Sequence, residues 1–249
     1  MKQRVKRKRR AKIFRLKWGR IIFLLVLICA FFYFVLSRSV FNISEILVEG
    51  NDKISKEDIL EASNLSNDDN YFFLNKKKAK ENLESLKYVK LVNIKRKLPF
   101  KIEINITERE ACAMFPVNEK YMLIDSDGII LEIVDNFTTN FALIRGLKLN
   151  DNLTEGENIA NFIKSEEQKQ FLNSILNSNI FEKTNAITFD DKKIDLVMNK
   201  DINVAFGGYN NVDYKIKVLN KILEDVEINN IKANMILMEE GSRPILVTD

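Results

Sequence analysis

The chain has 249 residues with 39 Lys and Arg, 35 Asp and Glu, two Cys and no His, for a formal net charge of +4. The length allows one large or two modest domains, and 46% hydrophobic residues with 8 Gly and 3 Pro exclude a mainly disordered, collagen-like or disulfide-stapled protein. Catalytic Ser-His-Asp and Cys-His sets require an imidazole, and zinc sites rely on His or on several Cys, so the composition argues against both classes.

The positive charge is concentrated at the N-terminus. Residues 1–38 contain twelve Lys and Arg and no acid, which leaves 27 basic and 35 acidic residues, a formal charge of −8, in residues 39–249. We expect residues 1–20 to form a basic cytoplasmic tail, because Lys and Arg accumulate on the cytoplasmic side of a span. Such a run can also bind nucleic acid. Attraction to anionic lipid beside a span is the simpler explanation, so no nucleic-acid partner is expected.

An apolar run follows, and residues 21–37 are predicted to form a transmembrane helix. The expected membrane anchors are Trp18, which suits the interface, Arg20, which can extend toward headgroups, and the ends of the run at Ile21 and Leu36. A cleaved signal peptide is the alternative, but no small-residue cleavage site follows the run. The sequence therefore predicts a single-pass protein with a cytoplasmic N-terminus and an extracytoplasmic remainder.

The two cysteines fall in different parts of this arrangement. Cys29 lies inside the span and Cys112 lies outside it, so they cannot form a disulfide within one chain. Cys112 lacks a His partner for a nucleophilic pair, and its neighbours are small or apolar. We interpret it as a strand residue and expect no catalytic, cofactor-binding or metal-ligating residues in the chain.

Residues 41–110 have the pattern of a small α+β domain with the element order βααββ. Apolar and charged residues alternate at 45–49, which indicates a half-buried strand. Residues 88–97 are rich in β-branched residues, and a turn is expected at Pro99. Strict alternation with three isoleucines on one face then predicts a strand over 101–108.

Two short helices are expected between the first two of these strands. Ser55 can cap a helix over residues 55–63, and Asn75 can cap a second one. Lys76 to Lys78 occupy the first turn of the second helix, where the helix dipole disfavours positive charge. A solvated face, an acidic partner and lipid headgroups remain the alternatives for these lysines.

Motifs in this region occur in the order and spacing of one known family. They are Val48-Glu49-Gly50-Asn51, Tyr88-Val89, Arg96-Lys97-Leu98-Pro99 and Glu108-Arg109-Glu110-Ala111. Together with the basic tail and single span, they resemble the FtsQ/DivIB bacterial cell-division proteins, and residues 41–110 resemble the POTRA domain of that family. Weaker similarity continues at residues 121–128 and at Ile144-Arg145-Gly146.

Residues 111–240 are expected to form a larger, mostly β domain with two helices. Strand candidates lie at residues 121–124, 128–134, 186–189, 194–198 and 202–206. Apolar residues at helical spacing predict one helix around 171–176 and another over 214–226. The fold class is therefore α+β, with an N-terminal transmembrane helix, a POTRA-like domain and this β domain. Residues 241–249 are either a last strand or a tail.

Two short motifs suggest chemistry but have simpler structural interpretations. Asp125 and Asp127 could be paired carboxylates for glycoside hydrolysis, but Asp-Ser-Asp-Gly is typical of a hairpin turn. Gly207 and Gly208 precede a predicted helix but lack the surrounding phosphate-loop pattern, so a turn is expected there too.

The C-terminal region contains a candidate interaction edge. Terminal strands often lie at sheet edges, where unpaired backbone groups can accept a partner strand. A closed pair between the two terminal runs is the alternative. The predicted partner-binding residues are Met235, Ile236, Leu237, Met238, Ile245, Leu246 and Val247.

The family resemblance implies a non-enzymatic membrane scaffold of the division machinery at the septum. It implies binding to the outer segments of small coiled-coil proteins of the FtsL/DivIC (FtsB) type, and an indirect effect on septal peptidoglycan synthases. A membrane-anchored cell-wall hydrolase using carboxylates and a POTRA-bearing transport component remain as alternatives. No small-molecule substrate is expected.

Overall fold

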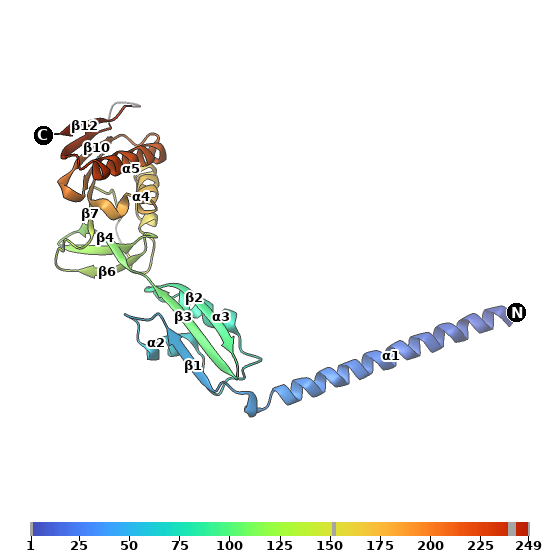
Figure 1. Cartoon of the computed structure of the whole chain (residues 1–249). Coiled ribbons are helices and arrows are strands. Elements are labelled where there is room, and N and C mark those ends of the chain that lie inside the picture. Colours follow the sequence, from blue (N-terminus) through green and yellow to red (C-terminus); the bar gives the residue numbers. More distant parts are fainter. Residues whose placement is uncertain (1, 151–152, 239–242, 249) are drawn as a thin grey trace. The chain divides into compact units, whose positions relative to one another are not determined.

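The computed structural model describes residues 2–150, 153–238 and 243–248, with side chains from Trp18 onward (Figure 1). The chain divides into two compact units, residues 1–85 with 91–107 and residues 86–90 with 108–249. The first unit contains the N-terminal helix and a three-stranded sheet, and the second contains a nine-stranded sheet. The α+β fold class predicted from the sequence is confirmed.

Helix α1 (Lys2–Leu36) includes the apolar run. Its segment Trp18–Leu36 has 19 residues and a mean hydropathy of 2.6, and none of its residues is buried in the protein. At ~1.5 Å per residue this segment is roughly 28 Å long, close to the ~30 Å thickness of a bilayer core. Of the helices in the described chain, it is the one long and apolar enough to cross a membrane.

The three-stranded sheet contains β1 (Glu45–Glu49), β2 (Val89–Lys97) and β3 (Lys101–Glu108). The strand order is β1-β3-β2, and β1 runs parallel to β3. Ile102, Ile104 and Ile106 are buried, as their alternation predicted. Residues 98–100 join β2 to β3, which matches the turn expected at Pro99.

Helices α2 (Lys56–Ser63) and α3 (Lys76–Glu84) pack against each other in the same unit. The hydroxyl of Ser55 accepts a hydrogen bond from Asp58 N at 3.1 Å, and Oδ1 of Asn75 accepts one from Lys78 N at 3.1 Å. Both side chains satisfy N–H groups that have no partner inside the helix, as predicted.

The nine-stranded sheet has the order β12-β11-β10-β9-β8-β7-β4-β5-β6. The sheet is mixed, because β7 runs parallel to β4 and β8, and β10 runs parallel to β11, whereas the other pairs are antiparallel. Its strands are β4 (Ala111–Val117), β5 (Lys120–Asp125), β6 (Ile130–Val134), β7 (Ala142–Arg145), β8 (Thr184–Phe189), β9 (Ile194–Met198), β10 (Asn203–Gly207), β11 (Ala233–Leu237) and β12 (Ile245–Thr248).

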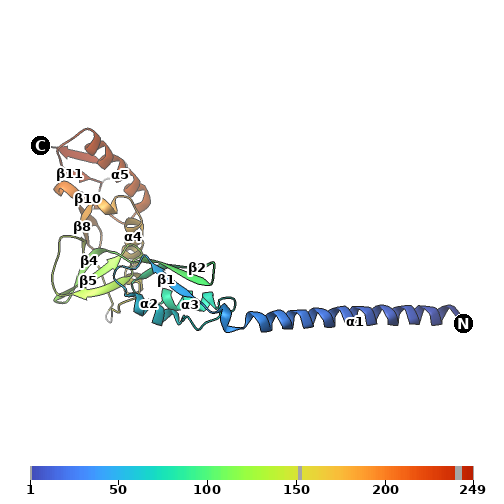
Figure 2. The same cartoon turned by 60° about the horizontal axis from the view of Figure 1, so that its bottom comes forward.

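Helices α4 (Glu166–Leu176) and α5 (Val212–Ile228) contribute to one core with this sheet. Figure 2 shows α5 beside β10 and β11. The buried ring of Phe171 from α4 packs edge-on against Phe189 of β8 at 5.5 Å and Phe206 of β10 at 5.1 Å between centroids. These helices match the two predicted from the apolar spacing.

The observed strands differ from the predicted ones in two places, and they decide between the two alternatives for the C-terminus. The strand expected from residue 128 begins at Ile130, because Gly128 adopts φ +79° in the preceding turn. The four-residue strand β7 was not predicted. Of the residues expected to be a last strand or a tail, Ile245–Thr248 form strand β12, whereas residues 241, 242 and 249 lie outside the described chain.

Candidate partner-binding edge

Strand β12 is the last strand of the nine-stranded sheet and pairs with β11. The two strands are antiparallel, so the closed pair considered as an alternative does form, and β11 has a neighbour on each side. Among the described residues, no strand pairs with the other side of β12. Its backbone N–H and C=O groups on that side can therefore accept a partner strand.

Four apolar side chains form a row on the solvent-facing side of the two strands. Met235 lies opposite Val247, and Leu237 lies opposite Ile245, so the four share one face. Ile245 is 58% exposed and Met235 is 39% exposed, while Leu237 is half-buried. We call Met235, Leu237, Ile245 and Val247 the outer row.

The other predicted contact residues point toward the core. Ile236 and Met238 are buried, and the half-buried Leu246 packs against the same core. Alternation along a strand sends every second side chain inward, whereas the predicted set contains residues from both faces of the two strands. Ile236 and Met238 are therefore core residues and no longer belong to the predicted contact set.

The opposite edge of the sheet, at β6, is more protected. Ile130 N donates to Glu157 O at 2.9 Å, and Gly156 N donates to Ile130 O at 2.7 Å. A neighbouring loop therefore already occupies backbone groups at the start of β6. The two edges differ in this respect, and β12 is the more accessible one.

A second surface of interest lies on the first unit, between α3 and β2. A hollow of about 490 Å³ is lined by Lys76, Lys77, Lys80 and the exposed Leu91. Lys76 Nζ donates to Ile94 O at 3.4 Å, and Lys77 forms an exposed ion pair with Glu81 at 3.5 Å. Of the three lysines in the first turn of α3, Lys76 and Lys77 thus make local contacts on this surface.

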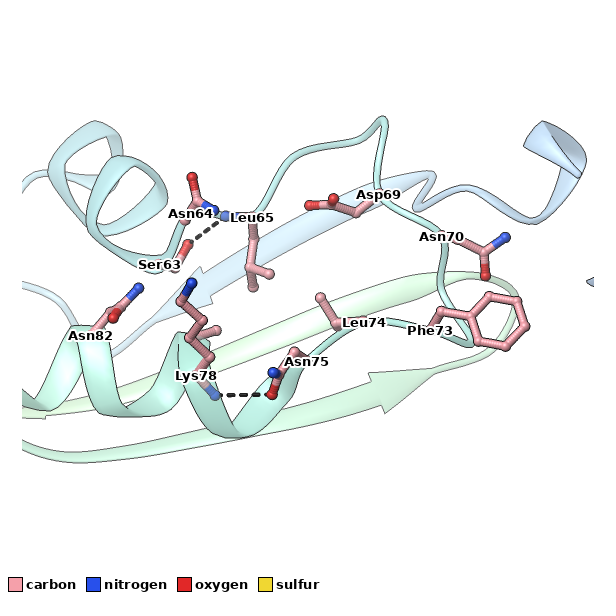
Figure 3. Close-up of a pocket in the computed structure, with 11 residues that line it drawn as sticks. Ser63, Asn64, Leu65, Asp69, Asn70, Phe73, Leu74, Asn75, Lys78 and Asn82 are labelled. Atoms are coloured by element: carbon pink, nitrogen blue, oxygen red, sulfur yellow. Dashed lines mark hydrogen bonds between the residues drawn. The ribbon is translucent and has the colours of Figure 1, made fainter. Parts of the chain in front are cut away.

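A smaller hollow of about 310 Å³ lies between the end of α2 and the start of α3 (Figure 3). In this view Lys78 extends toward the turn at Ser63 and Asn64. Ser63 Oγ accepts from Leu65 N at 3.3 Å, so its polar group is used locally. Within the described part of the chain, no group of three or more His, Cys, Asp or Glu residues could hold a metal ion.

The two carboxylates considered for hydrolysis form an ion-pair cluster with one arginine. Arg109 Nη1 lies 2.5 Å from Asp125 Oδ2 and 2.9 Å from Asp127 Oδ2. Asp125 is buried, and its Oδ1 also accepts from the backbone N–H groups of Asp127 and Ile129 at 3.0 and 2.8 Å. The expected turn is present, and the structure adds the arginine, whose role the sequence alone did not reveal.

The Gly207-Gly208 turn binds an ammonium group from the same chain. Lys215 of α5 is buried, and its Nζ donates to Phe206 O at 3.3 Å, Gly208 O at 2.8 Å and Asn210 Oδ1 at 3.1 Å. Burial lowers the pKa of Lys215 from its usual 10.5. This arrangement fixes the start of α5 to the end of β10. The Gly207-Gly208 turn therefore has a structural role in the fold.

The environment of Cys112 agrees with its interpretation as a strand residue. Cys112 lies in β4, and burial, followed by the negative charge of Asp125, raises the pKa of its thiol to about 12. The thiolate is the nucleophilic form of cysteine. Cys112 is therefore almost fully protonated, and unreactive, near neutral pH.

Comparison with known proteins identifies the family. The model of the FtsQ-type POTRA domain matches residues 41–109. The cell division protein DivIB of Clostridium tetani is 32% identical over 214 residues, which cover 83% of this chain and 79% of that protein. DivIB of Clostridium botulinum (strain Loch Maree) is 29% identical over 255 residues, covering 98% and 94%.

A solved structure of the major extracytoplasmic domain of DivIB from Geobacillus stearothermophilus aligns with 49% of this chain and 98% of that one, at 11% identity and a TM-score of 0.32. Membership rests instead on the sequence matches, which extend along both units. The chain belongs to the DivIB/FtsQ family of non-enzymatic bacterial cell-division proteins and carries an FtsQ-type POTRA domain.

Proposed function

We propose that the protein is a single-pass scaffold of the division machinery that binds small coiled-coil division proteins of the FtsL/DivIC (FtsB) type at the septum. Through them it regulates septal peptidoglycan synthesis without acting on a substrate itself. The basic tail supports a cytoplasmic N-terminus, because residues 1–38 have twelve Lys and Arg and no acid. Residues 39–249 would then face the compartment in which the cell wall is made.

The open edge of β12 carries this proposal. A partner segment that adds as a further strand would pair its backbone with β12 and place alternate side chains on the outer row. Since β12 has only four residues, it offers few backbone hydrogen bonds, each with a net contribution of about 0.5–1.5 kcal/mol. Burial of Ile245, Val247 and their neighbours must therefore supply much of the affinity and the specificity.

The two alternative functions receive less support. The family is non-enzymatic, and both Asp125 and Asp127 are engaged by Arg109, so neither is available as an independently tuned acid. The POTRA domain matches the FtsQ type, which favours cell division over transport. No nucleic acid or small molecule is part of the proposal.

Site-specific photocrosslinking of the full chain in dividing cells tests the proposal. A photoreactive residue at Val247, on the β12 edge, should crosslink to a small coiled-coil division protein. The matched control is Ile133 of β6, which is similarly exposed at 43% against 40% for Val247 but lies at the protected edge. Equal labelling from both positions, or normal septation after depletion of the protein, would refute the scaffold role.

A further inference from the structure

Three segments of the first unit meet at Phe41, shortly after the N-terminal helix ends. Phe41 O accepts from Tyr71 N at 2.9 Å, and the Phe41 ring packs edge-on against Phe72 and Phe100, with 5.6 Å between centroids in each pair. Residue 41 is therefore held against the loop before α3 and against the turn between β2 and β3. These contacts fix the three segments relative to one another within the unit.

Large apolar side chains remain exposed on these same segments. Leu98 is 84% exposed and Val40 is 74% exposed, and the rings of Phe72 and Phe73 are also exposed. We call Val40, Phe72, Phe73 and Leu98 the juxtamembrane tip. Exposed apolar residues grouped in this way usually mark an interaction site.

Positive charge lies beside the tip on residues 91–101 and at Arg38, whereas the loop that carries Phe72 and Phe73 begins with Asp68 and Asp69. Residues 91–101 contain four Lys and Arg and no acid, and Arg38 precedes Val40 in the chain. Arg96 donates to Phe72 O at 3.1 Å and lies 5.6 Å from the centre of the buried Tyr71 ring, so it is held against the backbone of the loop that carries Phe72 and Phe73. Lys97 and Lys101 pair with Glu103 and Glu45, respectively, whereas Lys95 is exposed.

The length of the connecting chain keeps the tip close to the membrane. Val40 is four residues beyond Leu36, the last residue of the apolar helix, so the two Cα atoms are at most about 14 Å apart. The headgroup region on each side of a bilayer is about 5–8 Å thick. This constraint depends on the covalent chain and holds for Val40 in any orientation of the POTRA domain.

We propose that the juxtamembrane tip is a second membrane contact, in which Val40, Phe72, Phe73 and Leu98 enter the headgroup region of the outer leaflet. Aromatic and cationic residues are the side chains that proteins place at this interface. Arg38, Lys95 and Arg96 attract anionic phospholipid, at about 1 kcal/mol per charge near the surface. The contact restricts the orientation of the POTRA domain and is independent of partner binding at β12.

Tryptophan fluorescence of the full chain in lipid vesicles tests this contact. The chain has one Trp, so Trp18→Phe provides a background without tryptophan fluorescence. Leu98→Trp then reports on the tip, and Leu91→Trp is the matched control, because it replaces another exposed Leu of the same chain segment seven residues away. Along an extended strand, seven residues correspond to roughly 23 Å.

In vesicles of phosphatidylcholine and phosphatidylglycerol, the emission of the Leu98→Trp variant should shift to shorter wavelength and be quenched by lipids brominated near the headgroup. The emission of the Leu91→Trp variant should be unaffected. Quenching of the Leu98→Trp variant should weaken in phosphatidylcholine alone or after Lys95→Gln. Phe73→Trp provides a second reporter if Leu98→Trp fails to fold. Equal quenching at residues 98 and 91, or no quenching at either tip position, would overturn the proposal. Absence of quenching at both tip positions is also the result expected if the tip binds a protein and not the membrane.

Discussion

Arg109 donates from Nη1 to Oδ2 of Asp125 across 2.5 Å, and the Asp125 carboxylate is almost completely removed from solvent. The same arginine donates from Nε to Val89 O at 3.1 Å, and its backbone N donates to Tyr88 O at 2.8 Å. Arg109 therefore connects residues 86–90, the start of β4 and the turn after β5 within the second unit. This links three separate segments through one side chain.

Arg109→Met should destabilise the second unit by about 3–5 kcal/mol, because it leaves the buried Asp125 carboxylate without its cation. Urea unfolding of the detergent-solubilised chain, followed by circular dichroism, measures the change. The matched control is Asp127→Asn. This substitution removes an exposed partner of the same arginine and should cost less than about 1 kcal/mol. Equal costs for the two variants would show that the buried pair has no special role.

Local sequence patterns predicted the helix caps and the strand faces, because these depend on residues close together in the chain. Ser55 and Asn75 cap their helices as expected, and Ile102 lies on the buried face assigned by alternation. The nine-strand order was not predictable in the same way, since it joins strands far apart in sequence. Strand β7 was missed because four residues are too short to show a periodic pattern.

The candidate site was predicted only in part for a related reason. An apolar run such as residues 233–238 shows no alternation, so it does not reveal which side chains face the core. The folded core decides this, because Ile236 is buried in the same core as side chains of α4, α5 and the sheet. Arg109 and Lys215 were likewise overlooked as structural residues, since their partners are identified only once the chain is folded.

Gly146 should be intolerant of a side chain. Its φ is +76°, and a Cβ atom would overlap the carbonyl oxygen of Phe189. Gly146→Ala combines the cost of a left-handed conformation, about 1–2 kcal/mol, with that of overpacking, about 1–3 kcal/mol. Gly156→Ala is the matched control, since φ is +85° there but the nearest atom, Cβ of Lys87, lies 3.7 Å away. Thermal unfolding should show a larger loss for Gly146→Ala, and an equal loss would contradict the predicted overlap.

Cys112 should react slowly with alkylating reagents in the folded protein. Its thiol pKa is raised from 9.0 to about 12, which lowers the thiolate fraction at pH 8 by about 1000-fold. Iodoacetamide labelling in a Cys29→Ser background measures the rate at this one thiol. Unfolding in urea should restore the ordinary rate. Labelling of the folded chain as fast as that of the unfolded chain would show that the thiol is not shielded.

Met235 and Ile236 are adjacent in β11 but should have separable roles, because they point to opposite faces of the sheet. Ile236→Ala removes a fully buried side chain and should lower the free energy of unfolding by about 2–5 kcal/mol. Met235→Ala alters an exposed member of the outer row and should change stability by less than about 0.5 kcal/mol while weakening partner crosslinking at Val247. Urea unfolding and crosslinking yield, measured on the same two variants, distinguish the effects. If Met235→Ala leaves the yield unchanged, the partner does not contact this part of the outer row.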